Sequence, residues 1–181
     1  QSSGKKTPVR ELFYYAAVAV AIAGIIFGIF FFMNPASPQK LADQYIREHL
    51  QTLGVQMNSQ ENSLQNGLRL FNEGKMAEAL VQFEKIIQSD TSDFTAKKYA
   101  GIVALRLGEY NKALAHFRDL EAYSNLYANP GKFYQALTLM ERNQSGDRDK
   151  AKQLLQELVQ QNLALGVANL AHLPLVHRIN E

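Results

Sequence analysis

The stretch GLRLFNEGKMAEALVQFEKII, residues 67–87, decides the fold because its pattern returns 34 residues later in GIVALRLGEYNKALAHFRDL, residues 101–120. Repetition at a fixed period of 20 to 50 residues is typical of repeat architectures. The chain is therefore expected to be all-α and built from stacked helix hairpins. Six positions carry the repeat: Gly67, Gly74, Met76, Ala79, Phe83 and Ile86 recur as Gly101, Gly108, Tyr110, Ala113, Phe117 and Leu120.

The small residues of the repeat predict how each hairpin packs. Gly67 would let the second helix approach the first closely, and Gly74 would end the first helix. Ala79 would keep the crossing tight, while Phe83 would fill the space toward the next hairpin. The equivalent residues of the second unit are expected to do the same.

The two stretches resemble the tetratricopeptide repeat family. A third, degenerate unit follows in FYQALTLMERNQSGDRDKAKQLLQELV, where Gly146 lies 38 residues after Gly108, so its turn is expected to be enlarged. The resemblance implies an α-solenoid of about three hairpins over residues 60–161. We place the units at 60–93, 94–127 and 128–161, and a capping segment at 162–181.

The resemblance also implies a binding groove lined by the first helix of each hairpin. This surface would be apolar with two cations, and it suits an extended or helical apolar segment whose carboxylate meets Lys98 or Arg106. The chaperone-tail clamp of some family members needs asparagine where this chain has Leu68, so no such clamp is expected. The groove positions fall on Leu64, Leu68, Phe71, Asn72, Lys98, Ile102, Leu105, Arg106, Phe133, Leu137, Met140 and Glu141.

An uncharged apolar run precedes the repeats, LFYYAAVAVAIAGIIFGIFFFM at residues 12–33. As a helix these residues would reach roughly 33 Å, enough to cross a bilayer core about 30 Å thick. A signal peptide has a shorter apolar stretch and a cleavage site, whereas this run ends in phenylalanines before Asn34 and Pro35. We expect a retained transmembrane helix. Its Gly24 and Gly28 form a GxxxG pair suited to packing against another membrane helix, although self-association and plain lipid exposure remain open.

Charge distribution predicts the orientation of this span. Residues 1–11 hold three basic residues and one acid, while Lys40 and Arg47 after the span are mixed with acids. Because basic residues favour the cytoplasmic side, we expect residues 1–11 in the cytoplasm and the rest outside it. In a bacterium this places the protein in the inner membrane, with its C-terminal domain in the periplasm.

The composition argues against several classes of function. Subtracting the charges of residues 1–11 from the totals of 19 basic and 17 acidic residues leaves 16 of each, so the outer domain has no electrostatic footprint for nucleic acid. The chain has no cysteine, which removes disulfides and thiolate chemistry. We find no HExxH, phosphate-cradling glycine loop or nucleophile elbow, and the four histidines show no metal-ligand spacing. We therefore expect no enzyme, no cofactor and no metal site.

A short linker at residues 34–37 separates the span from a helix predicted at 38–54, with Ser37 as its cap and Pro38 in its first turn. Leu41, Tyr45, Ile46, Leu50 and Leu53 form its apolar stripe. We expect this stripe to pack on the first repeat, with a partner or a second copy as alternatives. The groove is either open to a ligand or filled internally by this helix or by the tail after residue 162, since large exposed apolar patches are uncommon.

The leading hypothesis is a membrane-anchored scaffold or chaperone-like adaptor, similar to single-span periplasmic tetratricopeptide proteins of the bacterial envelope. Its partner would be another envelope or membrane protein, and self-association is a further option. One alternative is a structural accessory subunit of a larger membrane complex. Another is the sensor half of a transmembrane regulator whose cytoplasmic domain precedes Gln1.

Overall fold

The computed structural model describes residues 37–54, 63–123 and 129–164. These residues form helices and no strand, which confirms the all-α expectation. The chain divides into two units, Gln1–Ser37 and Pro38–Glu181, and every described helix belongs to the second.

The predicted membrane span lies outside the described ranges, as do its Gly24 and Gly28 and most of the predicted cap at 162–181. Within those ranges, no helix combines the length and apolar character needed to cross a bilayer.

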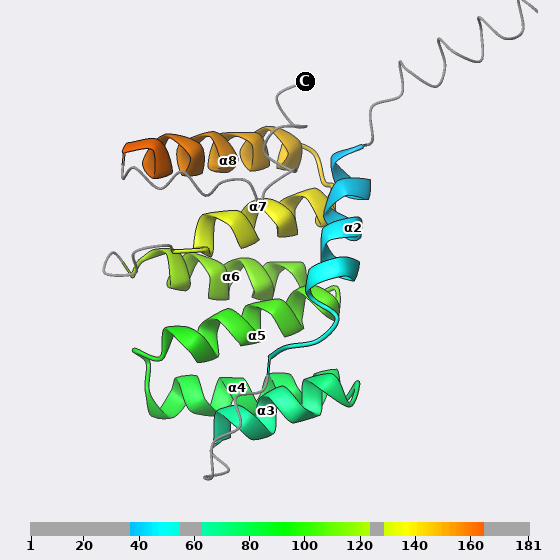
Figure 1. Ribbon diagram of the computed structural model, residues 1–181, viewed down its shortest axis with the longest axis vertical. Helices are drawn as coiled ribbons and strands as arrows, with labels where there is room; N and C mark the ends of the chain where they lie inside the picture. The colour runs from blue at the N-terminus through cyan, green and yellow to red at the C-terminus, as the bar shows by residue number, and fades with distance from the viewer. Residues whose placement is uncertain (1–36, 55–62, 124–128, 165–181) are drawn as a thin grey trace, which may run out of the picture. The chain divides into compact units, whose positions relative to one another are not determined.

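Six helices form three successive pairs, and a seventh precedes them. In Figure 1 the pairs are stacked in chain order, and the preceding helix, α2, runs across one side of the stack. The bounds are α2 Pro38–His49, α3 Ser63–Asn72, α4 Met76–Ser89, α5 Phe94–Arg106, α6 Tyr110–Glu121, α7 Gly131–Arg142 and α8 Asp147–Ala164.

The first two pairs turn in the same way. Gly74 and Gly108 both have positive φ angles, 79° and 74°, a conformation that glycine adopts without steric cost. In the first turn the Lys75 amide donates to the Leu70 carbonyl at 2.9 Å, and in the second the Glu109 amide donates to the Ala104 carbonyl at 2.8 Å. These bonds cap the last carbonyls of α3 and α5, so the two glycines end the first helices as predicted.

Each of these pairs also contains one close approach between a glycine and a phenylalanine. A Cβ atom added at Gly67 would lie 2.6 Å from Cε1 of Phe83, and one added at Gly101 would lie 2.8 Å from Cδ1 of Phe117. Both phenylalanine side chains are fully buried. The repeated glycine therefore makes room for the repeated ring.

The third pair has a different, longer turn. Asn143 takes the left-handed conformation, with φ 51°, and Gly146 follows with φ 83°. Arg142 donates two hydrogen bonds to Asp147, at 2.9 and 2.6 Å, and a third to Asn111 at 2.8 Å. A bidentate ion pair thus braces this turn and links it to the start of α6.

Candidate protein-binding site

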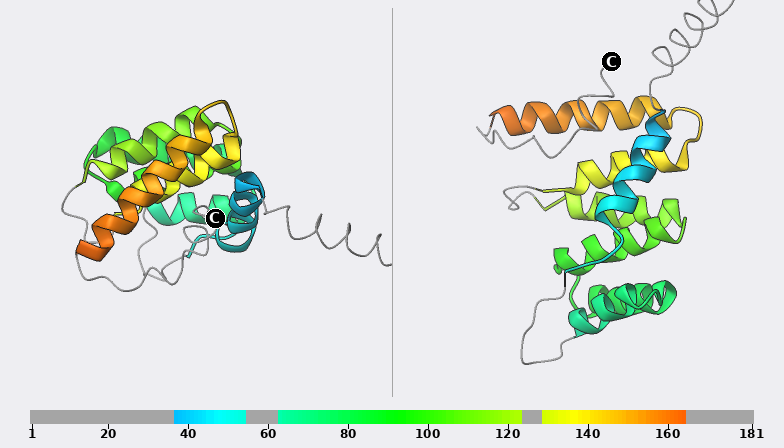
Figure 2. Two further views of the ribbon diagram at one scale, coloured as in Figure 1. Left: turned by 90° about the horizontal axis from the view of Figure 1, so that it is seen from above. Right: turned by 45° about the vertical axis from the view of Figure 1, so that its right-hand side comes forward.

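The first helices of the three pairs, α3, α5 and α7, form a face that we call the A face. The segment 38–54 lies across it and contacts all three helices, mainly α7 (Figures 1 and 2). The expectation that this segment packs on the first repeat is therefore wrong for α2, and it holds only for the residues after it. An apolar stripe requires burial, but the stripe does not select which helix covers it.

Two side chains of the A face bind the backbone just after α2. Arg106, the last residue of α5, donates from Nη1 to the carbonyl of Leu50 at 2.6 Å. Asn72, the last residue of α3, accepts from the Leu53 amide at 2.8 Å and donates to the Leu53 carbonyl at 2.9 Å. Both were predicted groove residues, and both recognise main-chain groups rather than a carboxylate.

The rest of α2 docks on α7 through aromatic and amide contacts. The rings of Tyr45 and Phe133 meet edge to face, with centroids 5.0 Å apart. Gln39 donates to the carbonyl of Glu141 at 3.4 Å and accepts from Asn143 at 3.2 Å. Leu41, Ala42 and Ile46 of α2 are buried, as are Leu50 and Leu53 after it.

Most of the predicted apolar groove residues belong to the core. Each exposes 3% or less of its surface, so they do not form an open apolar surface: Leu68, Phe71, Ile102, Leu105, Leu137 and Met140. Phe133 is also buried, at 7%. The choice between an open groove and one filled internally is thus resolved, over the part of the face that α2 crosses, in favour of filling.

Leu64 and Lys98 are the two predicted groove residues on the A face that are only partly buried and make no described contact with segment 38–54. The ammonium of Lys98 lies 4.5 Å from the ring centroid of Tyr99, and burial lowers the Lys98 pKa. Burial raises the pKa of Tyr134, with smaller contributions from Tyr45 and Tyr99. This part of the A face is therefore aromatic and carries one cation.

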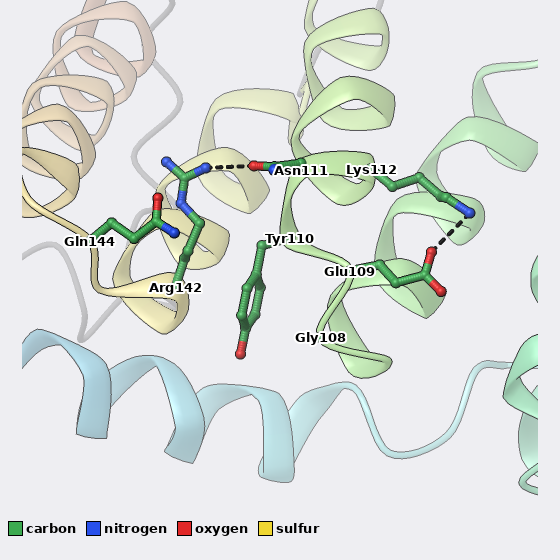
Figure 3. Close-up of a pocket in the computed structure, with 7 residues that line it drawn as sticks. All are labelled: Gly108, Glu109, Tyr110, Asn111, Lys112, Arg142 and Gln144. Carbon is green, nitrogen blue, oxygen red and sulfur yellow. Dashed lines mark hydrogen bonds and ion pairs between the residues drawn. The ribbon is translucent and has the colours of Figure 1, made fainter.

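A cleft of about 390 Å³ lies between α2 and the ends of the hairpins. Asp43 and Arg47 of α2 line it, together with Arg106, Tyr110 and Glu141 of the hairpins. A second cleft of about 340 Å³ opens beside it at the Gly108 turn (Figure 3). Figure 3 shows the Tyr110 side chain pointing toward α2, while Lys112 and Glu109 pair with each other away from it.

Glu141 is the least satisfied group in the larger cleft. Its Oε2 atom is buried and has no hydrogen-bond partner among the described residues. Burial raises the Glu141 pKa, the charge of Asp43 raises it further, and Arg47 lowers it. Arg47 itself is paired with Asp43, so its guanidinium is shared between two carboxylates.

Comparisons with protein families, curated proteins and solved structures find no match to this chain. The chemistry of the site must therefore be argued from its own geometry. Among the described residues, no three histidine, aspartate or glutamate side chains come together as a metal site would require. The A face instead presents main-chain-directed donors, aromatic rings and one helix already in place, which is an arrangement for binding polypeptide.

Sequence reasoning missed several residues of this site. Tyr45 was assigned to the apolar stripe of its helix, but the stripe gave no sign that it meets Phe133. Asp43 and Arg47 read as ordinary surface charges, and Tyr110 read as a repeat position. Only the shared spacing of Tyr110 with Met76 marked it, and that spacing gives no hint of α2.

Proposed function

We propose that the protein is a membrane-anchored interaction scaffold, whose hairpins form a tetratricopeptide-like solenoid and whose A face grips a helical segment of another polypeptide. The uncharged run at residues 12–33 supports the anchor because it is long enough to cross a bilayer. The 34-residue recurrence supports the solenoid, and the matching backbone bonds after Gly74 and Gly108 agree with it. The charge bias of residues 1–11 favours an inner-membrane protein with a periplasmic domain.

The observation that carries the binding role is the seating of segment 38–54 on the A face. This segment is an amphipathic helix with an apolar stripe, followed by extended residues, which is the form that helix-in-groove recognition takes. Arg106 and Asn72 hold it by its main chain. Since main-chain groups are common to all polypeptides, the same donors can hold a helix from a partner.

A matched pair of double variants tests this function. Leu64→Glu with Lys98→Glu places acids on the partly buried A face, and Val81→Glu with Lys85→Glu makes the same chemical change on the exposed surface of α4. Proteins crosslinked to the tagged full chain in native membranes are then identified and quantified by mass spectrometry. Circular dichroism checks that both variants keep their helices.

We expect the A-face variant to lose about 90% of a partner that the α4 variant retains, because an added charge at a desolvated contact costs more than about 1.4 kcal/mol, a factor of ten. Equal recovery of every crosslinked protein from the two variants would show that the A face does not bind the partner. Loss with the α4 variant alone would move the site to the opposite surface.

A further inference from the structure

Segment 38–54 fits the A face incompletely. The cleft of about 390 Å³ remains beside α2, and two carboxylates, Asp43 of α2 and Glu141 of α7, line it together. Glu141 Oε2 has no hydrogen-bond partner among the described residues, although its surroundings are buried. A buried carboxylate oxygen without a donor, close to a second acid, weakens the docking of the helix that carries that acid.

The charge that could satisfy Glu141 is engaged elsewhere. Arg47 lines the same cleft, but it pairs with Asp43 one turn earlier on α2. On the hairpin side Arg106 donates to the Leu50 carbonyl, and Tyr110 is the remaining titratable group of the cleft. The mismatch therefore originates from one residue of α2, Asp43.

The contacts that hold segment 38–54 do not depend strongly on its sequence. Arg106 and Asn72 bind main-chain atoms at Leu50 and Leu53, and the buried side chains are ordinary aliphatic residues spaced along one face, Leu41, Ala42 and Ile46. Another helix with the same stripe, ending in the same way, would satisfy every one of these contacts. If it lacked the acid at the position of Asp43, it would also relieve Glu141.

Building on the proposed function, we propose that α2 is a displaceable internal occupant of the A face, and that the partner segment is an amphipathic helix that copies the apolar stripe of α2 but has a neutral or basic residue in place of Asp43. The internal helix competes at the millimolar effective concentration typical of a short tether. The apparent affinity for a partner is reduced by the fraction of chains in which α2 is docked. Imperfect docking keeps that reduction small enough for a better-matched helix to overcome.

The probe is a fluorescent peptide of residues 37–54, and binding to the full chain in detergent micelles is measured by anisotropy. The chain is used in its natural form and with Leu41→Ser and Ile46→Ser, which remove two buried contacts of α2 and leave the A face intact. We expect the peptide to bind this variant at least about tenfold more tightly, because the internal competitor is weakened.

A second peptide with Asp43→Asn tests the charge mismatch. We expect it to bind the natural chain about three- to tenfold more tightly than the original peptide, since it removes the like charge and frees Arg47 for Glu141. A third peptide with Glu48→Gln makes the same charge change at an exposed position of α2 and should bind like the original. In a chain carrying Glu141→Gln, the advantage of the Asp43→Asn peptide should vanish.

A locked chain guards against misfolding of the serine variant. Because the natural chain has no cysteine, Gln39→Cys and Asn143→Cys give a unique pair whose side chains face each other. Joining them with a short reducible bis-methanethiosulfonate should abolish peptide binding, and reduction should restore it.

Each contrary result has a distinct meaning. Equal affinity of the peptide for the locked and reduced chains would overturn α2 as competitor while leaving the scaffold function standing. Equal affinity of the three peptides for the natural chain would overturn the role of Asp43. Absence of binding to every folded form would overturn the proposed function as well. Crosslinks between differently tagged copies through residues 39 and 143 would identify a second copy of the chain, rather than a partner, as the alternative occupant.

Discussion

Arg106 Nη1 donates a 2.6 Å hydrogen bond to the carbonyl oxygen of Leu50, a residue 56 positions earlier in the chain. The guanidinium also lies 5.8 Å from the ring centroid of Phe71, so one side chain joins the end of α5, the core of α3 and the segment after α2. Charge-assisted bonds of this kind are about twice as strong as neutral ones. The bond makes Arg106 the main polar anchor of segment 38–54.

Arg106→Gln should loosen α2 without unfolding the hairpins. Loss of a part-buried charge-assisted bond costs about 1.5–3 kcal/mol, so amide exchange in residues 38–49 should accelerate about tenfold or more while that of α5 and α6 stays nearly constant. Arg69→Gln is the control, because Arg69 pairs on the exposed side of α3 with Glu73 and Asn66. Unchanged exchange in α2 would show that Arg106 does not hold it.

Gly101→Ala should destabilise the hairpins strongly for an alanine substitution in a helix. The added methyl would meet the buried ring of Phe117, and overpacking of this kind costs about 1–3 kcal/mol. Thermal unfolding of the variant should therefore begin at a lower temperature, and Phe117→Leu in the same chain should recover part of the loss. Gly54→Ala, where no atom lies within 4 Å of the added methyl, should change little. Equal effects of the two alanines would contradict the close approach.

Docking of α2 should strengthen as the pH falls from neutral toward 4.5. The pKa of Glu141 is raised above its ordinary value of 4.5 in the docked state, chiefly by burial and then by Asp43, while Arg47 lowers it. A raised carboxyl pKa stabilises the docked state below the ordinary value, and this stabilisation is lost as the pH rises through the docked-state pKa. Arg106 stays charged and Tyr110 stays neutral across this window, because burial and Glu141 raise the pKa of Tyr110.

Glu141→Gln should remove this pH dependence and hold α2 in place at neutral pH. Limited proteolysis between pH 5 and 7.5, with cleavage of segment 38–54 as the readout, compares the natural chain with the variant. Cleavage of the natural chain that is independent of pH, or a variant that keeps the dependence, would contradict the role assigned to Glu141.

The turn of the third pair should be sensitive to acid for the opposite reason. Hydrogen bonds from Arg142 hold the pKa of Asp147 below its ordinary value of 3.8, so the ion pair stabilises the fold above that value and its contribution is lost as the pH falls through the lowered pKa. Asp147→Asn should cost about 2 kcal/mol at neutral pH, measured by urea unfolding. Asp149→Asn, an exposed acid one turn position away, is the matched control and should cost much less. Equal losses would show that the pair does not brace the turn.

The spacing of small and aromatic residues predicted the hairpins because it reports contacts close in sequence. Gly67 and Phe83 lie 16 residues apart and meet inside one pair. The docking of α2 could not be predicted in this way, because Gln39 and Glu141 are separated by 102 residues and no local pattern links them. The left-handed Asn143 was missed as well, since the longer third turn departs from the repeat.

The groove prediction succeeded and failed for a similar reason. Asn72 and Arg106 follow from the register of the repeat, and the structure places both against a bound segment. Their ligand was expected to be a carboxylate, but it is the main chain around Leu50 and Leu53. Register fixes which side chains share a face, whereas the identity of what covers that face depends on a separate element of the chain.

The account rests on α2 occupying the A face and leaving it when a better-matched helix arrives. Spin labels placed through cysteines at the exposed positions Gln44 of α2 and Gln88 of α4 measure this directly, by the distance distribution in the cysteine-free background. For the chain alone the account predicts a single narrow distribution. With excess Asp43→Asn peptide of residues 37–54, it predicts a shift to longer, broader distances. A distribution that stays narrow and unchanged while the peptide is bound would contradict it.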